Sequence, residues 1–360
     1  MSEPTQQIRF ARSPDGVRLA YAASGTGPVL IKAATWFSHI EHDWDSPVWR
    51  RLLHELSSRY RLVRFDERGC GLSDWHVPSL NFESWVSDLE TVVEALGNER
   101  FALLGLSQGA AVAIAYAVRH PERVSHLVLH GGYARGRLVR ATDAQQVEEA
   151  NMMVRMAELG WGKPDPSFRQ FFTTQFIPGG KPEQHQWFNE LKRISTSPEN
   201  AAGFMRTFAE IDVTALLPQV RCPTLVMHST RDVRVPFDEG RYLAAHIPNA
   251  QFLPIDSGNH LLLADEPGWA RALAAIEDFL PPTAARQGSD ERIATLSPRL
   301  LGLLDLMAQG RDNAQIAAVL GLAEKTVRNH ITQLFDRLEV EGRAQAIVLA
   351  RENGLGRRAG

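Results

Sequence analysis

The residue best suited to chemistry in this sequence is Ser107, which lies within the segment GLSQG at residues 105–109. An apolar stretch precedes this segment and an Ala/Val/Ile-rich stretch follows it, so we predict a sharp turn from a strand into a helix. A glycine two residues away on each side leaves the room that such a turn needs. The turn lifts the hydroxyl of Ser107 above the sheet edge, where it can attack an acyl group as a nucleophile.

A serine nucleophile needs a base, and the base needs an orienting acid. In chain order the candidates are Asp232 and His260, each of which comes shortly after a predicted strand. Both are expected on loops at the same sheet edge as Ser107. The alternative is a serine kept only as a structural remnant of the fold, but a matching Asp and His in this order argue against it.

A second polar cluster contains His39, His42, Asp43 and Asp45. Its spacing gives no firm metal-ligand geometry, so we expect no metal there and no cofactor elsewhere. We expect these residues to shape a pocket mouth or to cap a helix, with Asp45 or Ser46 as the N-cap before a proline.

The elements that must position Ser107 alternate between strands and helices. Besides the strand before Ser107, we predict a hairpin at 8–12 and 17–23, strands at 28–34, 60–65, 124–129, 222–228 and 251–255, and helices at 48–56, 82–96 and 269–280. This alternation predicts a doubly wound, mostly parallel α/β sheet.

Residues 134–217 interrupt the alternation, because they carry helical patterns and no strand signal. We interpret them as a helical cap. At least half of its aromatic and methionine side chains should form the cap's own core, and the others should roof Ser107.

Residues 8–280 together resemble the α/β-hydrolase family, through the GLSQG turn, the order Ser107, Asp232, His260 and the segment DERGCGLS at residues 66–73. The resemblance implies an α/β-hydrolase fold with a helical cap. It also implies acyl transfer to Ser107, with His260 as the base and Asp232 holding its tautomer.

The loop after the third strand departs from the family pattern. Members usually carry a His-Gly pair there, whereas this chain reads KAATW at residues 32–36. We therefore expect an oxyanion to be bound by the backbone N–H of Gln108 together with that of Ala34 or Thr35. A misplaced second donor would cost about 2.7–4 kcal/mol of transition-state stabilisation.

The composition is that of a folded protein with a large and a small domain. The 360 residues are 44% hydrophobic and 22% charged, with a formal net charge of −3. Residues 291–360 hold ten Lys/Arg against eight Asp/Glu, so a weakly basic segment follows an acidic one. With two distant cysteines, no export signal and no long apolar run, we expect a reduced, cytoplasmic protein that does not contact a membrane.

After the first domain at residues 1–280 and a polar linker at 281–294, we predict a small all-α domain at 295–360. In its third helix, residues 324–338, the side chains expected to face inward are Val327, Ile331, Leu334 and Leu338. With a short helix from Asn313 and a glycine turn before it, this pattern predicts a helix-turn-helix with its recognition helix. A helical bundle used only for dimerisation is the alternative.

Residues 295–355 resemble the LuxR/FixJ-type DNA-binding domain, on the segment QGRDNAQIAAVLGLAEKTVRNHITQLFDRLEVEGRAQAIVLA. Two positions depart from the pattern: Leu300 replaces a glutamate, and Ala323 replaces the serine that caps the recognition helix. The resemblance implies homodimers on inverted half-sites. The side chains placed to contact bases or phosphates of promoter DNA are Lys325, Thr326, Arg328 and Asn329.

The fusion of the two domains leads to the hypothesis of a transcriptional regulator. Its hydrolase-like domain would sense a small effector in a pocket lined by Trp36, Ser107, His260 and cap aromatics. Such a pocket favours a mainly apolar ligand with one carbonyl-like group, an ester, lactone or amide. One alternative is a true serine hydrolase of the esterase or lactonase type with a DNA-binding tail. Another is a sensor in which slow hydrolysis of the ligand, or its attachment to Ser107, is itself the signal.

Overall fold

The computed structural model describes residues 4–97, 100–280, 291–294, 296–320, 322–340, 342–352 and 355–356. The chain divides into two compact units near residue 281. In the described ranges, no helix combines the length and the apolar character needed to cross a bilayer.

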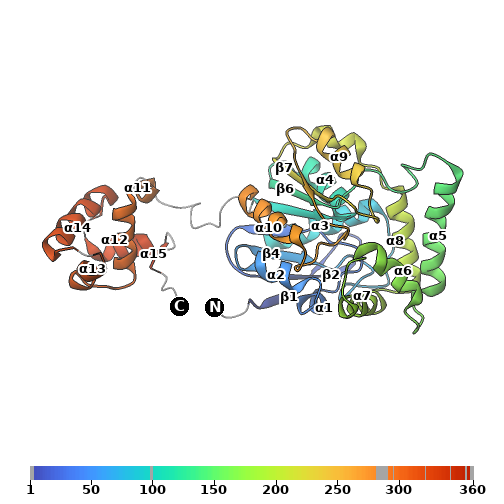
Figure 1. The fold of residues 1–360 in the computed structure, drawn as a ribbon, viewed down its shortest axis with the longest axis horizontal. Coiled ribbons are helices and arrows are strands. Elements are labelled where there is room, and N and C mark those ends of the chain that lie inside the picture. The colour runs from blue at the N-terminus through green and yellow to red at the C-terminus, as the bar shows by residue number, and fades with distance from the viewer. Residues whose placement is uncertain are drawn as a thin grey trace. The chain divides into compact units, whose positions relative to one another are not determined.

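The larger unit is built on one mixed sheet (Figure 1). Within the described residues its strands lie in the spatial order β1 (Gln6–Arg12), β2 (Arg18–Ser24), β4 (Arg61–Phe65), β3 (Val29–Lys32), β5 (Phe101–Leu106), β6 (Val124–His130), β7 (Thr224–Ser229) and β8 (Gln251–Ile255). Neighbours from β1 to β4 pair antiparallel, and those from β4 to β8 pair in parallel. Strands β3 and β5 are buried along their whole length, as expected of parallel strands covered on both faces.

The helices cover both faces of the sheet. Helix α2 (Arg50–Ser57) connects β3 to β4, and α3 (Phe82–Leu96) leads back past β3 to β5. Because both connections are right-handed and run in opposite directions, the two helices lie on opposite faces. Helices α4 (Gly109–Arg119) and α9 (Phe237–His246) continue in the direction of α3, and α10 (Pro267–Phe279) packs on β7 and β8. The predicted doubly wound, mostly parallel sheet is confirmed. Its reversal between β3 and β5 is where sheets of this kind bind ligands.

Helices fill the interval between β6 and β7. They are α5 (Ala144–Gly160), α6 (Ser167–Phe176), α7 (Pro182–Ser195), α8 (Pro198–Glu210) and a 3-10 turn, η1 (Thr214–Gln219). Helices α5 to α8 lie together on one side of the unit (Figure 1). Across residues 134–217, all of which are described, the only strand-like pairing is one bridge between Arg135 and Asp212.

A short helix, α1 (Ile40–Trp44), contains His42 and Asp43 of the polar cluster. His39 caps it, because its Nδ1 accepts a hydrogen bond of 3.3 Å from the N–H of His42. Ser46 accepts hydrogen bonds of 2.9 Å from two backbone N–H groups of the next turn. His39 and Ser46 therefore stabilise local helical turns. In the described part of the chain, no group of three or more His, Cys, Asp or Glu side chains is arranged to hold a metal ion.

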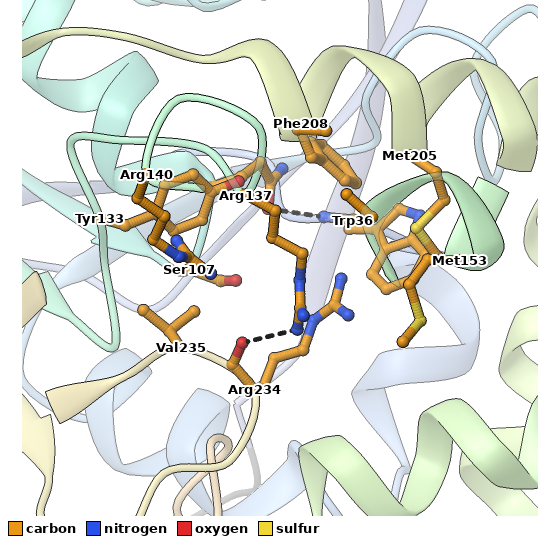
Figure 2. Close-up of a pocket in the computed structure, with 13 residues that line it drawn as sticks. Trp36, Ser107, Tyr133, Arg137, Arg140, Met153, Met205, Phe208, Arg234 and Val235 are labelled. Atoms are coloured by element: carbon orange, nitrogen blue, oxygen red, sulfur yellow. Dashed lines mark hydrogen bonds between the residues drawn. The ribbon is translucent and has the colours of Figure 1, made fainter. Parts of the chain in front are cut away.

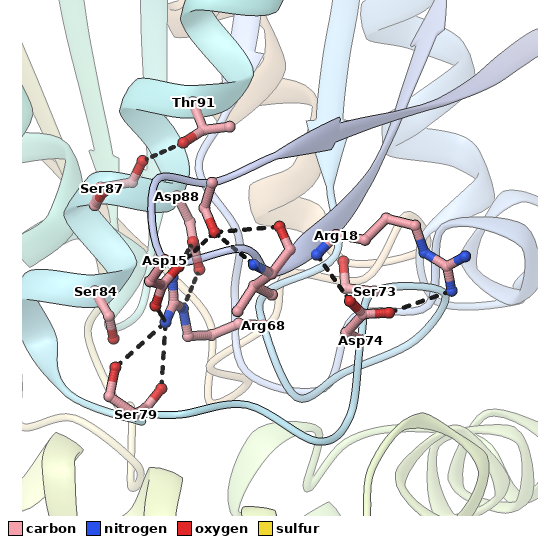
Figure 3. Close-up of polar contacts among 12 residues, drawn as sticks. Asp15, Arg18, Arg68, Ser73, Asp74, Ser79, Ser84, Ser87, Asp88 and Thr91 are labelled. Carbon is pink, nitrogen blue, oxygen red and sulfur yellow. Dashed lines mark hydrogen bonds and ion pairs between the residues drawn. The ribbon is translucent and has the colours of Figure 1, made fainter.

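Arg68, in the segment at residues 66–73, joins three parts of the larger unit (Figure 3). Its side chain is 1% exposed and donates hydrogen bonds of 2.7 and 2.8 Å to the two carboxylate oxygens of Asp88 on α3. It also donates hydrogen bonds of 2.6 and 3.2 Å to Asp15, in the turn between β1 and β2. The hydrogen bond from Arg68 lowers the pKa of Asp15 to about 2. One buried cation thus fixes the hairpin, the loop after β4 and α3 together.

The smaller unit consists of helices α11 (Glu291–Ala294), α12 (Pro298–Ala308), α13 (Asn313–Leu320), α14 (Glu324–Leu338) and α15 (Arg343–Glu352). The structure differs from the predicted linker at 281–294 in the last four residues of that segment. Its residues 281–290 lie outside the described residues, but the last four form α11. Ile293 is 6% exposed and packs in the same apolar core as Leu304 and Leu334, so the unit begins before residue 295.

Candidate functional site

Ser107 occupies the turn between β5 and α4. Its φ of 51° lies in the left-handed region, which is rare for a residue with a side chain. The flanking glycines are needed sterically. A Cβ on Gly105 would lie 2.7 Å from the Cα of Ala110, and a Cβ on Gly109 would lie 2.7 Å from the carbonyl oxygen of Ala34. The turn is therefore as tight as the spacing of the glycines predicts.

Asp232 and His260 lie on the loops after β7 and β8. Nδ1 of His260 donates a hydrogen bond of 2.7 Å to Oδ2 of Asp232. Oδ1 of Asp232 accepts hydrogen bonds of 2.8 and 3.0 Å from the N–H groups of Arg234 and Val235. Burial alone would raise the pKa of Asp232, but the neighbouring His260 and these hydrogen bonds lower it. An ionised Asp232 is suited to hold the His260 ring with its proton on Nδ1.

The other ring nitrogen of His260, Nε2, is buried and has no hydrogen-bond partner in the described chain. His260, Ser107 and His130 line one small cavity of about 40 Å³, which we name the lower cavity. The structure thus brings the three predicted residues to one edge of the sheet. In the described chain Ser107 therefore makes no hydrogen bond to Nε2 of His260. Such a bond between a nucleophile and its base commonly tightens only when substrate binds. The catalytic role of these residues stays a prediction.

Gln108 ties the turn at Ser107 to the loop after β3. Its side chain is 1% exposed, accepts a hydrogen bond of 3.2 Å from the N–H of Trp36 and donates one of 3.4 Å to the carbonyl oxygen of Ala34. The N–H of Trp36 is therefore engaged. The backbone N–H groups of Gln108, Ala34 and Thr35 remain the candidate oxyanion donors.

A second cavity, which we name the upper cavity, lies where the cap meets Ser107 (Figure 2). Cap helices α5 and α8 contribute Met153, Met205 and Phe208, and the ring of Trp36 lies beside them. The cavity has a volume of about 30 Å³.

Three arginines also line the upper cavity: Arg137 and Arg140 follow β6, and Arg234 follows β7. The expected lining of Trp36, Ser107, His260 and cap aromatics therefore needs two corrections. Guanidinium groups share the lining with the apolar side chains, and His260 lines the lower cavity instead. One signal in the sequence could have revealed the first point, because residues 135–140 contain three arginines within an otherwise acidic domain.

In the smaller unit, α14 has the two faces that its sequence predicts. Its buried residues are Val327, Ile331, Leu334 and Leu338. Of the predicted DNA-contacting residues, Thr326 is half-buried, and those exposed are Lys325, Arg328 and Asn329. Such a face can enter a major groove, and its contact with DNA stays a prediction.

The ends of these helices also follow the predicted pattern. Ala323 occupies the N-cap of α14 in extended conformation and makes no side-chain cap hydrogen bond. Arg343, at the start of α15, donates a hydrogen bond of 2.9 Å to Oδ1 of Asn313 at the start of α13. This bond joins two of the positions that carried the family resemblance.

The chain is similar to known proteins in both units. Residues 40–267 match the family described as alpha/beta hydrolase fold, and residues 294–350 match the family described as bacterial regulatory proteins, luxR family. The chain is 26% identical over 249 residues to a pimeloyl-acyl-carrier-protein methyl ester esterase of Nitrosomonas europaea, covering 64% of this chain and 87% of the esterase. It is 25% identical over 241 residues to the strigolactone esterase of Arabidopsis thaliana, covering 62% and 82%. A malate-bound thermophilic esterase of Thermogutta terrifontis has 26% identity and a TM-score of 0.62, covering 76% of this chain and 97% of that structure.

Proposed function

Because the chain belongs to the alpha/beta hydrolase fold family and ends in a luxR-family DNA-binding domain, we propose that it is a transcriptional regulator controlled by a small molecule. In this proposal the larger unit binds a molecule with an acyl group beside Ser107. Binding of this molecule changes the affinity of the smaller unit for promoter DNA. The observation that carries the proposal is one chain with a cap-roofed cavity at Ser107 and an exposed basic face on α14.

The acyl group is the part of the ligand that the geometry specifies best. A carbonyl carbon beside the hydroxyl of Ser107 places its oxygen near the N–H groups of Gln108 and of Ala34 or Thr35. Esters, lactones and amides all present such a carbonyl. The relatives named above are esterases, which supports an ester or lactone as the first choice.

On the DNA side, the proposal assigns base or phosphate contacts to Lys325, Arg328 and Asn329, and a phosphate contact to Thr326. Two copies of the chain would bind two half-sites of inverted orientation, since the spacing of such half-sites follows the two-fold symmetry of a dimer. A regulator of this kind works in the cytoplasm, where bacterial DNA lies.

Control by the ligand requires that the ligand bind one state of the protein more tightly than another. Couplings of this kind typically change affinity about 5- to 150-fold. The same factor must apply in both directions, so promoter DNA must also change the affinity for the ligand.

A second candidate function is serine hydrolysis, and one observation favours it. A receptor that only binds has no need for the hydrogen bond of 2.7 Å between His260 and Asp232. In hydrolysis, Oγ of Ser107 bonds to the carbonyl carbon while its proton passes to Nε2 of His260. That proton leaves with the alcohol, and water then releases the acid and restores Ser107. If the second half is slow, the acylated enzyme can itself be the signal.

One experiment separates these functions. Ser107 of the full chain is modified with a fluorophosphonate, which occupies the site permanently, and binding to DNA from upstream of its own gene is measured by gel shift. We expect the modification to change the affinity at least about fivefold, and Ser107→Ala, treated in the same way, to show no change. Turnover of p-nitrophenyl butyrate above about 1 s⁻¹ would favour the hydrolase. Failure to bind any such fragment, modified or not, would overturn the regulator.

A further inference from the structure

Three arginines bring positive charge to the upper cavity. Arg137, Arg140 and Arg234 all line it, and in the described part of the chain none of the three has a carboxylate within 4.0 Å. Asp232, which lies nearby in sequence, is already engaged by His260 and by two backbone N–H groups. Arg155, on the surface of the same unit, by contrast pairs with Glu158 at 2.8 Å.

The protein holds the three guanidinium groups in place without satisfying them. Arg234 lies 5.1 Å from the ring centre of Trp36 and 5.0 Å from that of Phe176, and its Nη1 donates a hydrogen bond of 3.1 Å to Gln175. Arg137 donates a hydrogen bond of 3.0 Å to the carbonyl oxygen of Arg234. Arg140 donates a hydrogen bond of 2.8 Å to the carbonyl oxygen of Arg135. Each guanidinium has five N–H donors, so these bonds engage only a minority of them.

These charges lie beside the nucleophile rather than on the surface. Figure 2 shows the side chains of Arg137 and Arg234 between Ser107 and Trp36. Arg234 is 9% exposed, so its charge is almost wholly removed from water. Burial lowers the pKa of Arg137 and Arg140, and burial together with Arg137 lowers that of Arg234 to about 9. With a pKa of about 9, Arg234 stays cationic at neutral pH, and the charges of Arg137 and Arg140 both act against it.

Trp36, which lines the same cavity, carries a second unsatisfied group. The indole Nε1 of Trp36 is buried and has no hydrogen-bond partner in the described chain. An unpaired buried donor is costly in a folded protein. A hydrogen-bond acceptor on a bound molecule would satisfy it.

We propose that the ligand of the Ser107 site is an anionic ester or lactone whose carboxylate is held by Arg137, Arg140 and Arg234. The inference rests on the proposed ligand site at Ser107 and adds the charge of the ligand. Guanidinium forks match carboxylate geometry. Ser107 and the three arginines line the same cavity, so the carbonyl and the carboxylate belong to one small molecule. A phosphate group presents similar acceptors and is tested separately.

The test compares two probes of nearly equal size, monomethyl glutarate, which carries one carboxylate, and dimethyl glutarate, which carries none. Binding to the full-length Ser107→Ala protein, which cannot turn the esters over, is measured by calorimetry. We expect the monoester to bind at least about tenfold more tightly, because hydrogen bonds to charged groups are the stronger ones. Equal binding of the two esters, or tighter binding of the diester, would overturn the inference. If inorganic phosphate binds more tightly than the monoester, the anionic group of the ligand is a phosphate and the proposed carboxylate is wrong.

Substitutions locate the effect. In Arg234→Gln the preference for the monoester should fall to within about twofold, while binding of the diester changes little. Arg155→Gln, on the outer part of α5, is the matched control and should keep the preference. Should Arg234→Gln not fold, Arg140→Gln carries the same expectation, and an unchanged preference there would count against the site. The calorimetric comparison contains no DNA, so its result does not depend on whether the ligand changes DNA binding. The proposed regulator function and the proposed anionic ligand can therefore fail independently.

Discussion

Nδ1 of His260 donates a hydrogen bond of 2.7 Å to Asp232, while Nε2 on the other side of the same ring is buried without a partner. A general base requires this arrangement of the imidazole ring, because the nitrogen without a hydrogen-bond partner must be the one that accepts a proton. In Asp232→Asn the ring loses both the charge and the acceptor that fix its tautomer. We expect the rate at which Ser107 reacts with a fluorophosphonate to fall by a factor on the order of 10³–10⁴.

Asp256→Asn is the control for this prediction, since the side chain of Asp256 is 78% exposed and pairs with Arg231 at the surface. It should react at the rate of the wild type. Wild-type reactivity in Asp232→Asn would mean that Ser107 is not activated by this pair, and the hydrolase function would lose its support.

The exposed face of α14 predicts a salt-dependent loss of DNA binding. Lys325 and Arg328 carry the positive charge that we assign to the DNA contact. Replacing both by Ala should abolish the gel shift at moderate salt. It should also reduce the slope of log affinity against log salt by about 0.9 for each lost phosphate contact. Arg299→Ala, on α12, is the control and should bind normally; a double variant that binds as the wild type does would contradict a recognition role for α14.

The N-cap of α14 predicts a stabilising substitution. Ala323 has the extended conformation of an N-cap residue (φ −74°, ψ 145°) but no side-chain oxygen to accept a hydrogen bond from the first turn. Ala323→Ser should therefore stabilise the smaller unit by about 0.5–2 kcal/mol. Chemical denaturation of the full chain, followed by helical circular dichroism, should show the transition of this unit at higher denaturant. An unchanged midpoint would mean that the N–H groups of this turn are already satisfied.

Two of the ion pairs in Figure 3, Arg68–Asp88 and Arg18–Asp74, should differ strongly in their contribution to stability. Asp88 and Arg68 are 0% and 1% exposed, so Asp88→Ala leaves a buried guanidinium with only Asp15 as a carboxylate partner. We expect a loss of about 3–5 kcal/mol in the free energy of unfolding of the larger unit. Arg18 pairs with Asp74 at the surface, and Arg18→Ala should cost less than about 1 kcal/mol. Equal effects of the two substitutions in urea denaturation would refute this difference.

His130, which lines the lower cavity, predicts a loss of stability in acid. Burial, and then the neighbouring rings of His260 and His228, lower its pKa from 6.5 to about 3. Between these two values the unfolded chain binds a proton that the folded chain does not, so stability is complete above pH 6.5 and falls as the pH drops toward 3. At pH 5 the contribution of His130 to this loss is on the order of 2 kcal/mol.

The variant His130→Gln tests this, because glutamine does not titrate. From pH 7.5 to pH 5 the free energy of unfolding of the larger unit should fall less in His130→Gln than in the wild type. His228, whose pKa is also lowered by burial, is present in both proteins and cancels in the comparison. Identical pH profiles would show that His130 is protonated in the folded protein at pH 5.

The parts of this structure that the sequence predicts are those set by local pattern. The glycines at 105 and 109 predict the strained turn at Ser107, and helical spacing identifies the buried face of α14 from Val327 to Leu338. The order of Ser107, Asp232 and His260 predicts their meeting at one sheet edge, although their catalytic roles stay a prediction.

The parts that the sequence does not predict depend on contacts between distant residues. Asp15 and Asp88 have no pattern that pairs them with Arg68, because the three meet only in the folded sheet. In the same way, Arg137 and Arg234 lie almost a hundred positions apart and come together because the loops after β6 and β7 end at the same edge. The charge of a cavity is therefore harder to predict than its nucleophile.

The burial of Ile293 sets a practical limit on dissecting this protein. A fragment cut at residue 295, where the family resemblance begins, would lose a side chain that fills the core of the helical unit. The loss would expose apolar surface of the core that also contains Leu304 and Leu334, and exposed apolar surface favours self-association. A DNA-binding fragment intended for crystallography or NMR should therefore start upstream of α11 rather than at residue 295.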